Sequence, residues 1–179
     1  MRKVVSGLFI SLDGVVESPH LWQFDVFDKD MEDAMIKFLA DIDTVLLGRV
    51  TYQEWAAYWP AADDDGYGDF INNAPKYVAS TTLDRVEWQN STLITGGVAA
   101  TINRLKAEPG KTIGVQGSPT LVRSLLSAGL LDELTLMVHP VIAGPGKRLF
   151  PGGETLQRMD LIDSRITGSG VAILTYWPK

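Results

Sequence analysis

Short apolar runs that end in glycine or a small hydroxyl residue, and then lead into a helix-like segment or a loop, constrain the fold of this sequence most. Three clear examples cover Thr44–Leu47, Lys76–Ala79 and Thr112–Gln116. Runs of four or five residues that are bounded in this way predict strands. Strands that alternate with helices predict a sheet with parallel strands in its centre and helices on its faces.

Helix signals separate these strands. Residues Asp28–Asp43 place methionine, phenylalanine and leucine side chains on one helical face, and Asp28 or Asp30 is expected to cap its start. A later helix is punctuated by Ser118 at the N-cap and Gly129 past its end. The remaining predicted helices cover Thr51–Trp59 and Val98–Lys106.

The last third of the chain changes character. Leu134–Val138 predicts a strand, and a glycine- and proline-containing loop follows it. Asp160–Thr167 and Val171–Trp177 predict an antiparallel hairpin at the sheet edge. We therefore expect one α/β domain over residues 1–179, a three-layer α/β/α arrangement whose mixed sheet has a parallel centre and an antiparallel C-terminal edge hairpin.

Composition excludes several classes of function. The net charge of −6 argues against general nucleic-acid binding, and the run at 63–65 (Asp-Asp-Asp) is expected to be a solvated loop. With no cysteine and two histidines, a transition-metal site is not expected. No apolar run approaches the roughly 20 residues that span a bilayer. We expect a cytoplasmic protein without a membrane anchor.

Candidate binding residues follow three of the predicted strands. Gly48 permits close approach of a ligand, Arg49 offers a cation, and Thr51 is expected to cap the next helix, which leaves its amides free for a phosphate. Ser80 and Thr81 offer hydroxyl groups at the second strand end. Both stretches are also compatible with ordinary turns, in which hydroxyl groups bind the backbone.

The third strand end is the strongest of the three signals. Gln116 and Gly117 form a tight turn, and Ser118 then opens a helix whose N-terminus favours an anion such as pyrophosphate. The carboxyl ends of parallel strands share one edge of a sheet, so the three candidate stretches are expected to lie together.

In this order, the motifs resemble the dihydrofolate-reductase-like superfamily. The ordered set is Gly-Arg-x-Thr-Tyr, Ser-Thr-Thr, Gln-Gly-Ser and the loop Gly-x-Gly-Lys-Arg-Leu-Phe-Pro. The segments SLDGVV and SLLSAGLLDELTLMVHPVIAGPGKRLFPGG are typical of stand-alone bacterial relatives of the reductase domain of riboflavin biosynthesis. The resemblance runs from about Val4 to Tyr176.

The resemblance implies NADPH as cofactor and assigns residues to it. Phosphate contacts fall on residues of the first strand end, the adenosine 2′-phosphate on those of the second, and the pyrophosphate on the third, with Leu121 on the adjoining helix face. The assigned residues are Gly48, Arg49, Thr51, Ser80, Thr81, Gln116, Gly117, Ser118 and Leu121. Gln116 replaces the first of two adjacent glycines, and Val138 replaces a helper threonine. Both departures argue against a folate-specific enzyme.

Catalytic candidates are fewer. Asp13 ends the first strand beside the expected nicotinamide, although an Asx turn onto Gly14 would also explain it. Glu32 lies at about the spacing of the pterin-binding carboxylate of the superfamily, although a solvated helix face also explains it. Trp22 and Trp55 are candidates for stacking against a flat substrate, with ordinary packing as the alternative.

Two functions fit this pattern. One is an NADPH-dependent reductase that transfers hydride to a small pterin-, pyrimidine- or flavin-related heterocycle. The other is a non-catalytic protein of the same fold that binds a dinucleotide or a heterocycle. A homodimer is also expected from the resemblance, with the apolar segment Leu130–Ile142 as a candidate surface.

Overall fold

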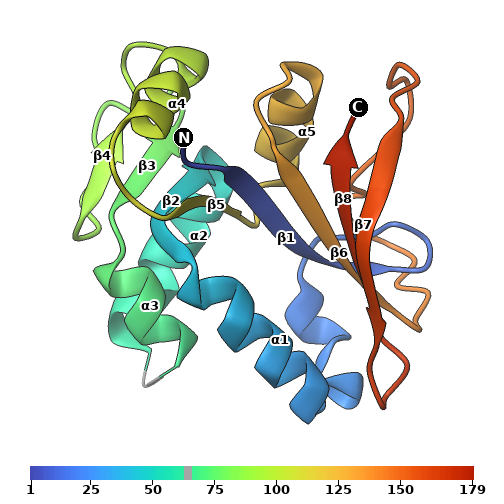
Figure 1. Cartoon of the computed structure of the whole chain (residues 1–179). Helices are drawn as coiled ribbons and strands as arrows, with labels where there is room; N and C mark the ends of the chain where they lie inside the picture. The colour runs from blue at the N-terminus through green and yellow to red at the C-terminus, as the bar shows by residue number, and fades with distance from the viewer. Residues whose placement is uncertain (63–65) are drawn as a thin grey trace.

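The computed structural model describes residues 1–62 and 66–179. It contains an eight-stranded sheet in the order β4-β3-β2-β5-β1-β6-β8-β7 (Figure 1). The parallel strands are β1 (Val4–Ser11), β2 (Ile42–Gly48), β3 (Lys76–Ala79), β4 (Ser91–Leu93), β5 (Thr112–Gln116) and β6 (Glu133–His139). The antiparallel edge hairpin is β7 (Met159–Ile166) and β8 (Ala172–Pro178). The expected mixed sheet is confirmed.

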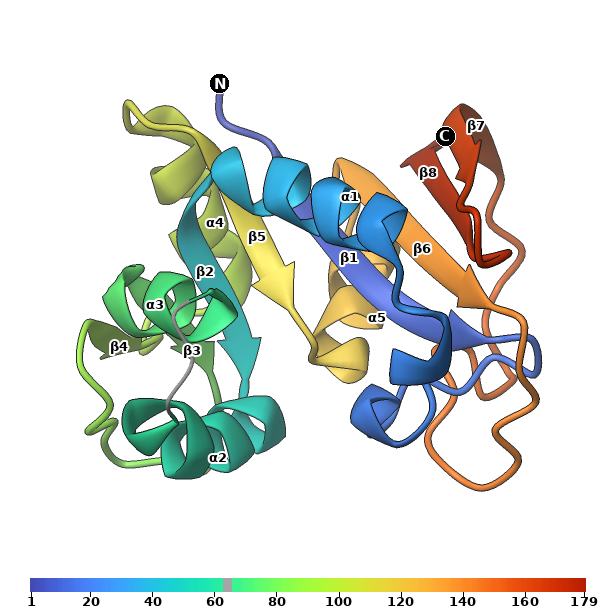
Figure 2. The same cartoon turned by 90° about the horizontal axis from the view of Figure 1, so that it is seen from below.

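Helices cover both faces of this sheet, which gives the predicted three layers. The α-helices are α1 (Lys29–Ala40), α2 (Arg49–Tyr58), α3 (Tyr67–Asn73), α4 (Val98–Ala107) and α5 (Pro119–Ser127). Figures 1 and 2 show α1 and α5 on opposite faces of the central strands. Among the described residues, no helix is both long enough and apolar enough to cross a membrane.

Side-chain alternation along the strands divides the core between the two faces. Leu46 on β2 packs with Ile102 of α4 and Leu125 of α5 in one cluster. Val45 and Leu47, its neighbours along the strand, belong to the cluster under α1, α2 and α3. Strand residues point alternately to opposite faces, so β2 supplies both clusters.

Several boundaries differ from the expected ones. Strands β3 and β5 match the prediction residue for residue, whereas β2 begins at Ile42 and α1 ends at Ala40. Helix α3 (Tyr67–Asn73) is an element that the sequence interpretation did not predict. The predicted acidic loop at 63–65 lies outside the described residues.

Candidate functional site

The turns that follow β2 and β5 lock together through two hydrogen bonds. The Oγ of Ser118 accepts a hydrogen bond of 2.8 Å from the amide of Gly48. In return, the amide of Ser118 donates to the Oγ1 of Thr51 at 3.1 Å. Both turns lie at the carboxyl ends of neighbouring parallel strands, where ligands of open α/β sheets bind.

Glycine is required at the centre of this junction. Gly117 has a φ of +51°, and a Cβ there would lie 3.1 Å from the Cγ2 of Thr51. A Cβ on Gly48 would lie 3.4 Å from Ser118 and 3.9 Å from the Cβ of Leu121. Glycine at 117 therefore follows from the left-handed backbone and the close contact with Thr51, whereas a Cβ at Gly48 would make only ordinary contacts.

Two helices begin at this junction with their N-termini uncapped by side chains. Gly48 is the N-cap of α2 and Ser118 is the N-cap of α5, and neither forms a side-chain cap. The expectation that Thr51 caps α2 is wrong, because Thr51 is the third residue of the helix and its hydroxyl binds Ser118. Uncapped amides and two helix dipoles favour an anion here.

Arg49 extends from the first turn of α2 into solvent. Its guanidinium donates to the Oε1 of Gln53 at 2.8 Å, one helical turn away. Within residues 1–62 and 66–179, no carboxylate forms an ion pair with this side chain. Its charge is therefore available to an anionic ligand at the start of α2.

Ser80 and Thr81 follow β3, beside the end of β2. The register pairs Gly48 with Ala79, so the second candidate stretch lies next to the first, as expected. The Oγ of Ser80 accepts hydrogen bonds from the amides of Thr82 and Leu83 at 3.1 and 3.0 Å. The turn alternative thus describes the present contacts of Ser80, whereas Thr81 is exposed.

The side chain of Gln116 lies beneath the junction and not in it. Its Oε1 accepts a hydrogen bond of 3.2 Å from the hydroxyl of Tyr67, and its buried Nε2 has no partner among the described residues. Tyr67 also packs edge-on against Trp55, with ring centroids 5.7 Å apart. A ligand at the turn would therefore meet the backbone of Gln116.

Trp55 lies at the boundary between the core and the junction. Its Cζ2 is 3.6 Å from the position of a Cβ on Gly117, while its ring also contacts Trp59 and Tyr67. The sequence interpretation missed Tyr67, although the spacing of Tyr67, Phe70 and Ile71 was a signal for a short amphipathic helix.

The carboxylate of Asp13 is fully occupied by its own chain. Its Oδ1 accepts hydrogen bonds from the hydroxyl of Ser11 and the amide of Ala143 at 2.6 and 2.9 Å. Its Oδ2 accepts from the amide of Gly144 at 2.9 Å and lies 3.5 Å from Arg148. The hydroxyl of Ser11 and then the amide of Ala143 lower the pKa of Asp13 to about 2. This carboxylate joins two loops and remains ionised at neutral pH.

Trp22 lies at the end of β6, on the far side of β5 and β1 from Trp55. It packs edge-on against His139 at 5.3 Å, and His139 packs against Phe9 at 5.5 Å. The Nδ1 of His139 is 2.9 Å from the carbonyl oxygen of Met137, so Nδ1 carries the proton. Its buried Nε2 has no partner among the described residues, and burial lowers the pKa of His139.

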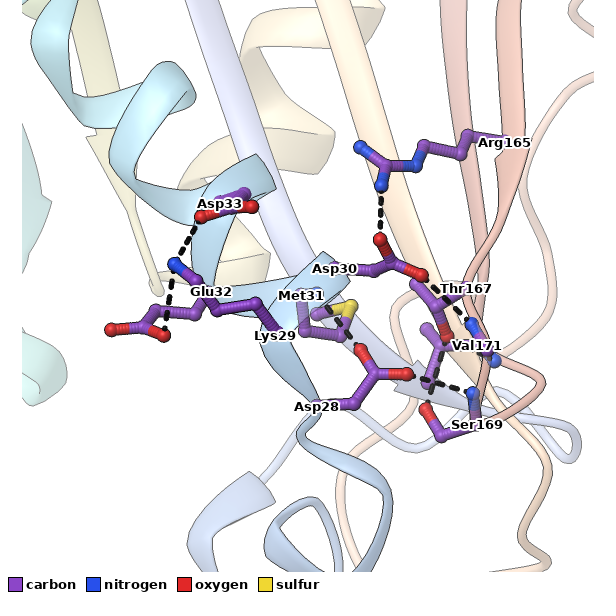
Figure 3. Close-up of polar contacts among 11 residues, drawn as sticks. Asp28, Lys29, Asp30, Met31, Glu32, Asp33, Arg165, Thr167, Ser169 and Val171 are labelled. Carbon is purple, nitrogen blue, oxygen red and sulfur yellow. Dashed lines mark hydrogen bonds and ion pairs between the residues drawn. The ribbon is translucent and has the colours of Figure 1, made fainter.

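Glu32 points away from the sheet edge, on the solvent face of α1. Its carboxylate lies 3.4 Å from the Nζ of Lys29, which also pairs with Asp33 (Figure 3). More than half of the Glu32 side chain is exposed. The structure does not bring Glu32 together with the other candidate residues.

Asp28 and Asp30 bind the turn between β7 and β8 (Figure 3). Asp28 caps α1 by accepting from the amide of Met31, and its second oxygen accepts from the amide of Ser169 at 2.7 Å. Asp30 accepts from the amide of Gly168 at 3.0 Å and pairs with Arg165. These carboxylates therefore attach the C-terminal hairpin to the start of α1.

Comparison with known proteins identifies relatives of this chain. The RibD C-terminal domain model matches residues 2–173. The Bacillus subtilis (strain 168) protein named uncharacterized protein YyaP is 30% identical over 179 residues, which cover 98% of this chain and 94% of the relative. A second protein of that strain, uncharacterized protein YwjB, is 31% identical over 151 residues, or 83% of each chain.

Solved structures share the fold. A Shewanella sp. PV-4 protein superposes with a TM-score of 0.80 at 20% identity, and covers 99% of both chains. The riboflavin biosynthesis reductase Rib7 of Saccharomyces cerevisiae gives a TM-score of 0.63 at 16% identity, with 99% of this chain and 89% of that chain covered. Together with the sequence matches, these findings show that the chain belongs to the RibD C-terminal domain family.

Proposed function

We propose that this protein is an NADPH-dependent reductase that transfers hydride to a small heteroaromatic substrate of the pterin, pyrimidine or flavin type. The junction of β2 and β5 carries the proposal, because two uncapped helix N-termini meet there around Gly117. Membership of the RibD C-terminal domain family supports it.

The residues at the junction fit a dinucleotide phosphate. The amides at the starts of α2 and α5 would bind phosphate oxygens, Arg49 would add a cation, and Thr51 would hold the two turns in place through Ser118. Ser80 and Thr81 would lie nearest the adenosine end, one strand further out. When bound, NADPH supplies the hydride, and the protein positions it.

The substrate would lie over the ends of β5 and β1. Trp55 stands beside β2 and β5, and Trp22 stands at the end of β6. Three strand spacings of about 4.8 Å separate the axes of β2 and β6 in the sheet, and we propose that a flat heterocycle lies across the strand ends between these two aromatic residues. Asp13 keeps its pKa of about 2 and donates no proton at neutral pH, so we propose that solvent supplies the proton.

A non-catalytic binding protein is the second candidate. One observation favours it: of the two predicted catalytic carboxylates, Asp13 is bound to a neighbouring loop and Glu32 faces solvent. A steady-state assay separates the two functions. We expect the absorbance of NADPH to fall when a panel of pterins, pyrimidines and flavins is added to the folded protein. Saturable binding of NADPH without oxidation by any compound would favour the binding protein.

The expected homodimer and cytoplasmic location remain predictions. The segment Leu130–Ile142 includes β6, and its apolar residue Ile142 is exposed. Light scattering at micromolar concentration measures the mass directly. A mass near twice 19.6 kDa supports the homodimer, and a mass near 19.6 kDa rejects it.

A further inference from the structure

The turn that joins β7 to β8 holds the carbonyl oxygen of Val26, which lies in the segment between β1 and α1. The hydroxyl of Ser169 donates to this oxygen at 2.6 Å. Because the one proton of that hydroxyl is used there, the hydroxyl of Thr167 donates to the Oγ of Ser169, at 3.0 Å (Figure 3). The Oγ1 of Thr167 in turn accepts from the amide of Val171 at 3.0 Å. A continuous chain of hydrogen bonds therefore runs through the hairpin turn and ends on Val26.

The same turn also holds the chain two residues further on. Ser169 binds Val26 through its hydroxyl and Asp28 through its amide, at 2.6 and 2.7 Å. Phe27 lies between these two anchored residues and packs against a buried cluster that also contains Val171, next to β8. The end of the segment between β1 and α1 is thus fixed to the C-terminal hairpin on both sides of Phe27.

Residues 18–26 have few other attachments. They form two single 3-10 turns, η1 (Pro19–Leu21) and η2 (Phe24–Val26), and no residue of either turn is buried. The backbone hydrogen bonds of these turns span three or four residues. Among the described residues, the bond from Ser169 is the only hydrogen bond that joins residues 18–26 to a distant part of the chain. A segment of this kind opens locally at low cost when such a bond is lost.

Trp22 belongs to this segment, and its ring lies at one end of a series of ring contacts. The ring centroids of Trp22 and His139 are 5.3 Å apart, and those of His139 and Phe9 are 5.5 Å apart. Phe9 then contacts Phe27 at 6.4 Å. The series therefore begins and ends in the same segment, and Val26 lies between its two ends in the sequence. A shift of the backbone at Val26 would act on Trp22 from both directions.

We propose that Ser169 is a positioning residue, which holds Trp22 against His139 at the carboxyl end of β6 through the carbonyl oxygen of Val26. The inference rests on the proposed function for the role of Trp22 beside the substrate. The C-terminal hairpin thus sets the substrate side of the site, whereas the cofactor side at β2 and β5 depends on separate hydrogen bonds. Loss of the Ser169 hydroxyl weakens substrate binding and leaves cofactor binding unchanged.

Hydrogen exchange of the full chain, followed by mass spectrometry, tests the anchor without any substrate. Ser169→Ala removes the donor to Val26 and Ser169→Thr keeps it, while Ser164→Ala removes an exposed hydroxyl of β7 in the same hairpin. We expect the amides of residues 21–27 to exchange about tenfold faster in Ser169→Ala alone. The amides of α5 are the internal reference and should exchange as in the wild type. Unchanged exchange of residues 21–27 in Ser169→Ala, or faster exchange throughout the chain, would overturn the inference.

Steady-state kinetics with a heterocycle that the protein reduces separates positioning from stability. We expect Ser169→Ala to raise the KM of the heterocycle about tenfold, with kcat and the Kd of NADPH within about twofold of the wild type. Ser169→Thr should restore the KM. A lower melting temperature with unchanged KM, or weaker binding of NADPH, would contradict the positioning role. If no compound is reduced, the proposed function fails, and the hydrogen exchange of residues 21–27 decides the inference by itself.

Discussion

The junction of β2 and β5 and the start of α1 both concentrate polar residues at the end of an element, and they use them in opposite ways. At the junction, the hydroxyl groups of Thr51 and Ser118 accept hydrogen bonds that hold two turns together, and the helix N-termini remain without side-chain caps. At the start of α1, Asp28 and Asp30 satisfy the amides of the chain itself. Polar residues are candidates for a ligand site only where hydrogen-bonding capacity is left over.

The largest effect is expected from removal of the hydroxyl that joins the two turns. Thr51→Val keeps the shape of the side chain and leaves the buried amide of Ser118 without its acceptor. We expect the free energy of unfolding to fall by about 1–3 kcal/mol, with weaker NADPH binding. Thr51→Ser keeps the hydroxyl and is the matched control. Denaturant unfolding measures the effect. Equal stability of Thr51→Val and wild type would show that the hydrogen bond between Thr51 and Ser118 does not stabilise the junction.

A smaller effect on stability, without an effect on cofactor binding, is expected at the start of α1. Asp28→Ala removes the cap of α1 and the acceptor for Ser169. We expect the melting temperature to fall by a few degrees and NADPH binding to stay unchanged. Asp33→Ala, on the solvent face of the same helix, is the control. Loss of NADPH binding in Asp28→Ala, with binding retained in Asp33→Ala, would show that the start of α1 also contributes to cofactor binding.

The carboxylate of Asp13 predicts a pH dependence. Its pKa in the folded chain is lowered from the ordinary 3.8 to about 2, so its stabilising effect is complete above pH 3.8 and is lost as the pH falls from 3.8 toward 2. We expect Asp13→Asn to be less stable than the wild type at pH 7 and to approach it near pH 2. Unfolding across this range gives the comparison. A difference that stays constant with pH would contradict the assigned contacts.

The smallest effect is expected from Glu32. Glu32→Gln removes one exposed ion pair with Lys29 and touches neither the junction nor the hairpin. We expect a melting temperature within about 1 °C of the wild type and unchanged NADPH oxidation. An assay with saturating substrate is sufficient. A large loss of turnover would show that Glu32 is a catalytic residue, although its side chain lies on the solvent face of α1.

Local sequence patterns predicted most of the fold. The runs Lys76–Ala79 and Thr112–Gln116 form strands with the expected bounds. Ser118 stands at the N-cap of α5 and Gly129 past its end, as expected, although Ser118 forms no side-chain cap. The start of β2 was harder to place. Ile42 continues the apolar spacing of α1, yet it pairs with Thr112 in the sheet. Periodicity alone does not distinguish the last turn of a helix from the first residue of a buried strand.

The candidate site was predictable in part. The three strand ends lie along one edge of the sheet because parallel strands place their carboxyl ends together, and this follows from topology. The hydrogen-bond partners of the carboxylates could not be predicted from topology or from the local sequence. Asp28 binds an amide 141 residues away and Asp13 binds one 131 residues away. Local sequence patterns do not contain such contacts. The sequence therefore could not distinguish carboxylates that bind the chain itself from carboxylates that are free to bind a ligand.

Calorimetric titration with NADPH, with wild type beside Gly117→Asp and Arg49→Ala, is the direct test for a cofactor site at the junction of β2 and β5. Gly117 has a φ of +51° and a Cβ there would lie 3.1 Å from Thr51, so Gly117→Asp should abolish binding through strain, crowding and added negative charge. Arg49→Ala should weaken binding about tenfold through the loss of one cation. Gly129→Asp, where a Cβ meets open space, controls for the charge. No binding of NADPH by the folded wild type would contradict the proposed cofactor site.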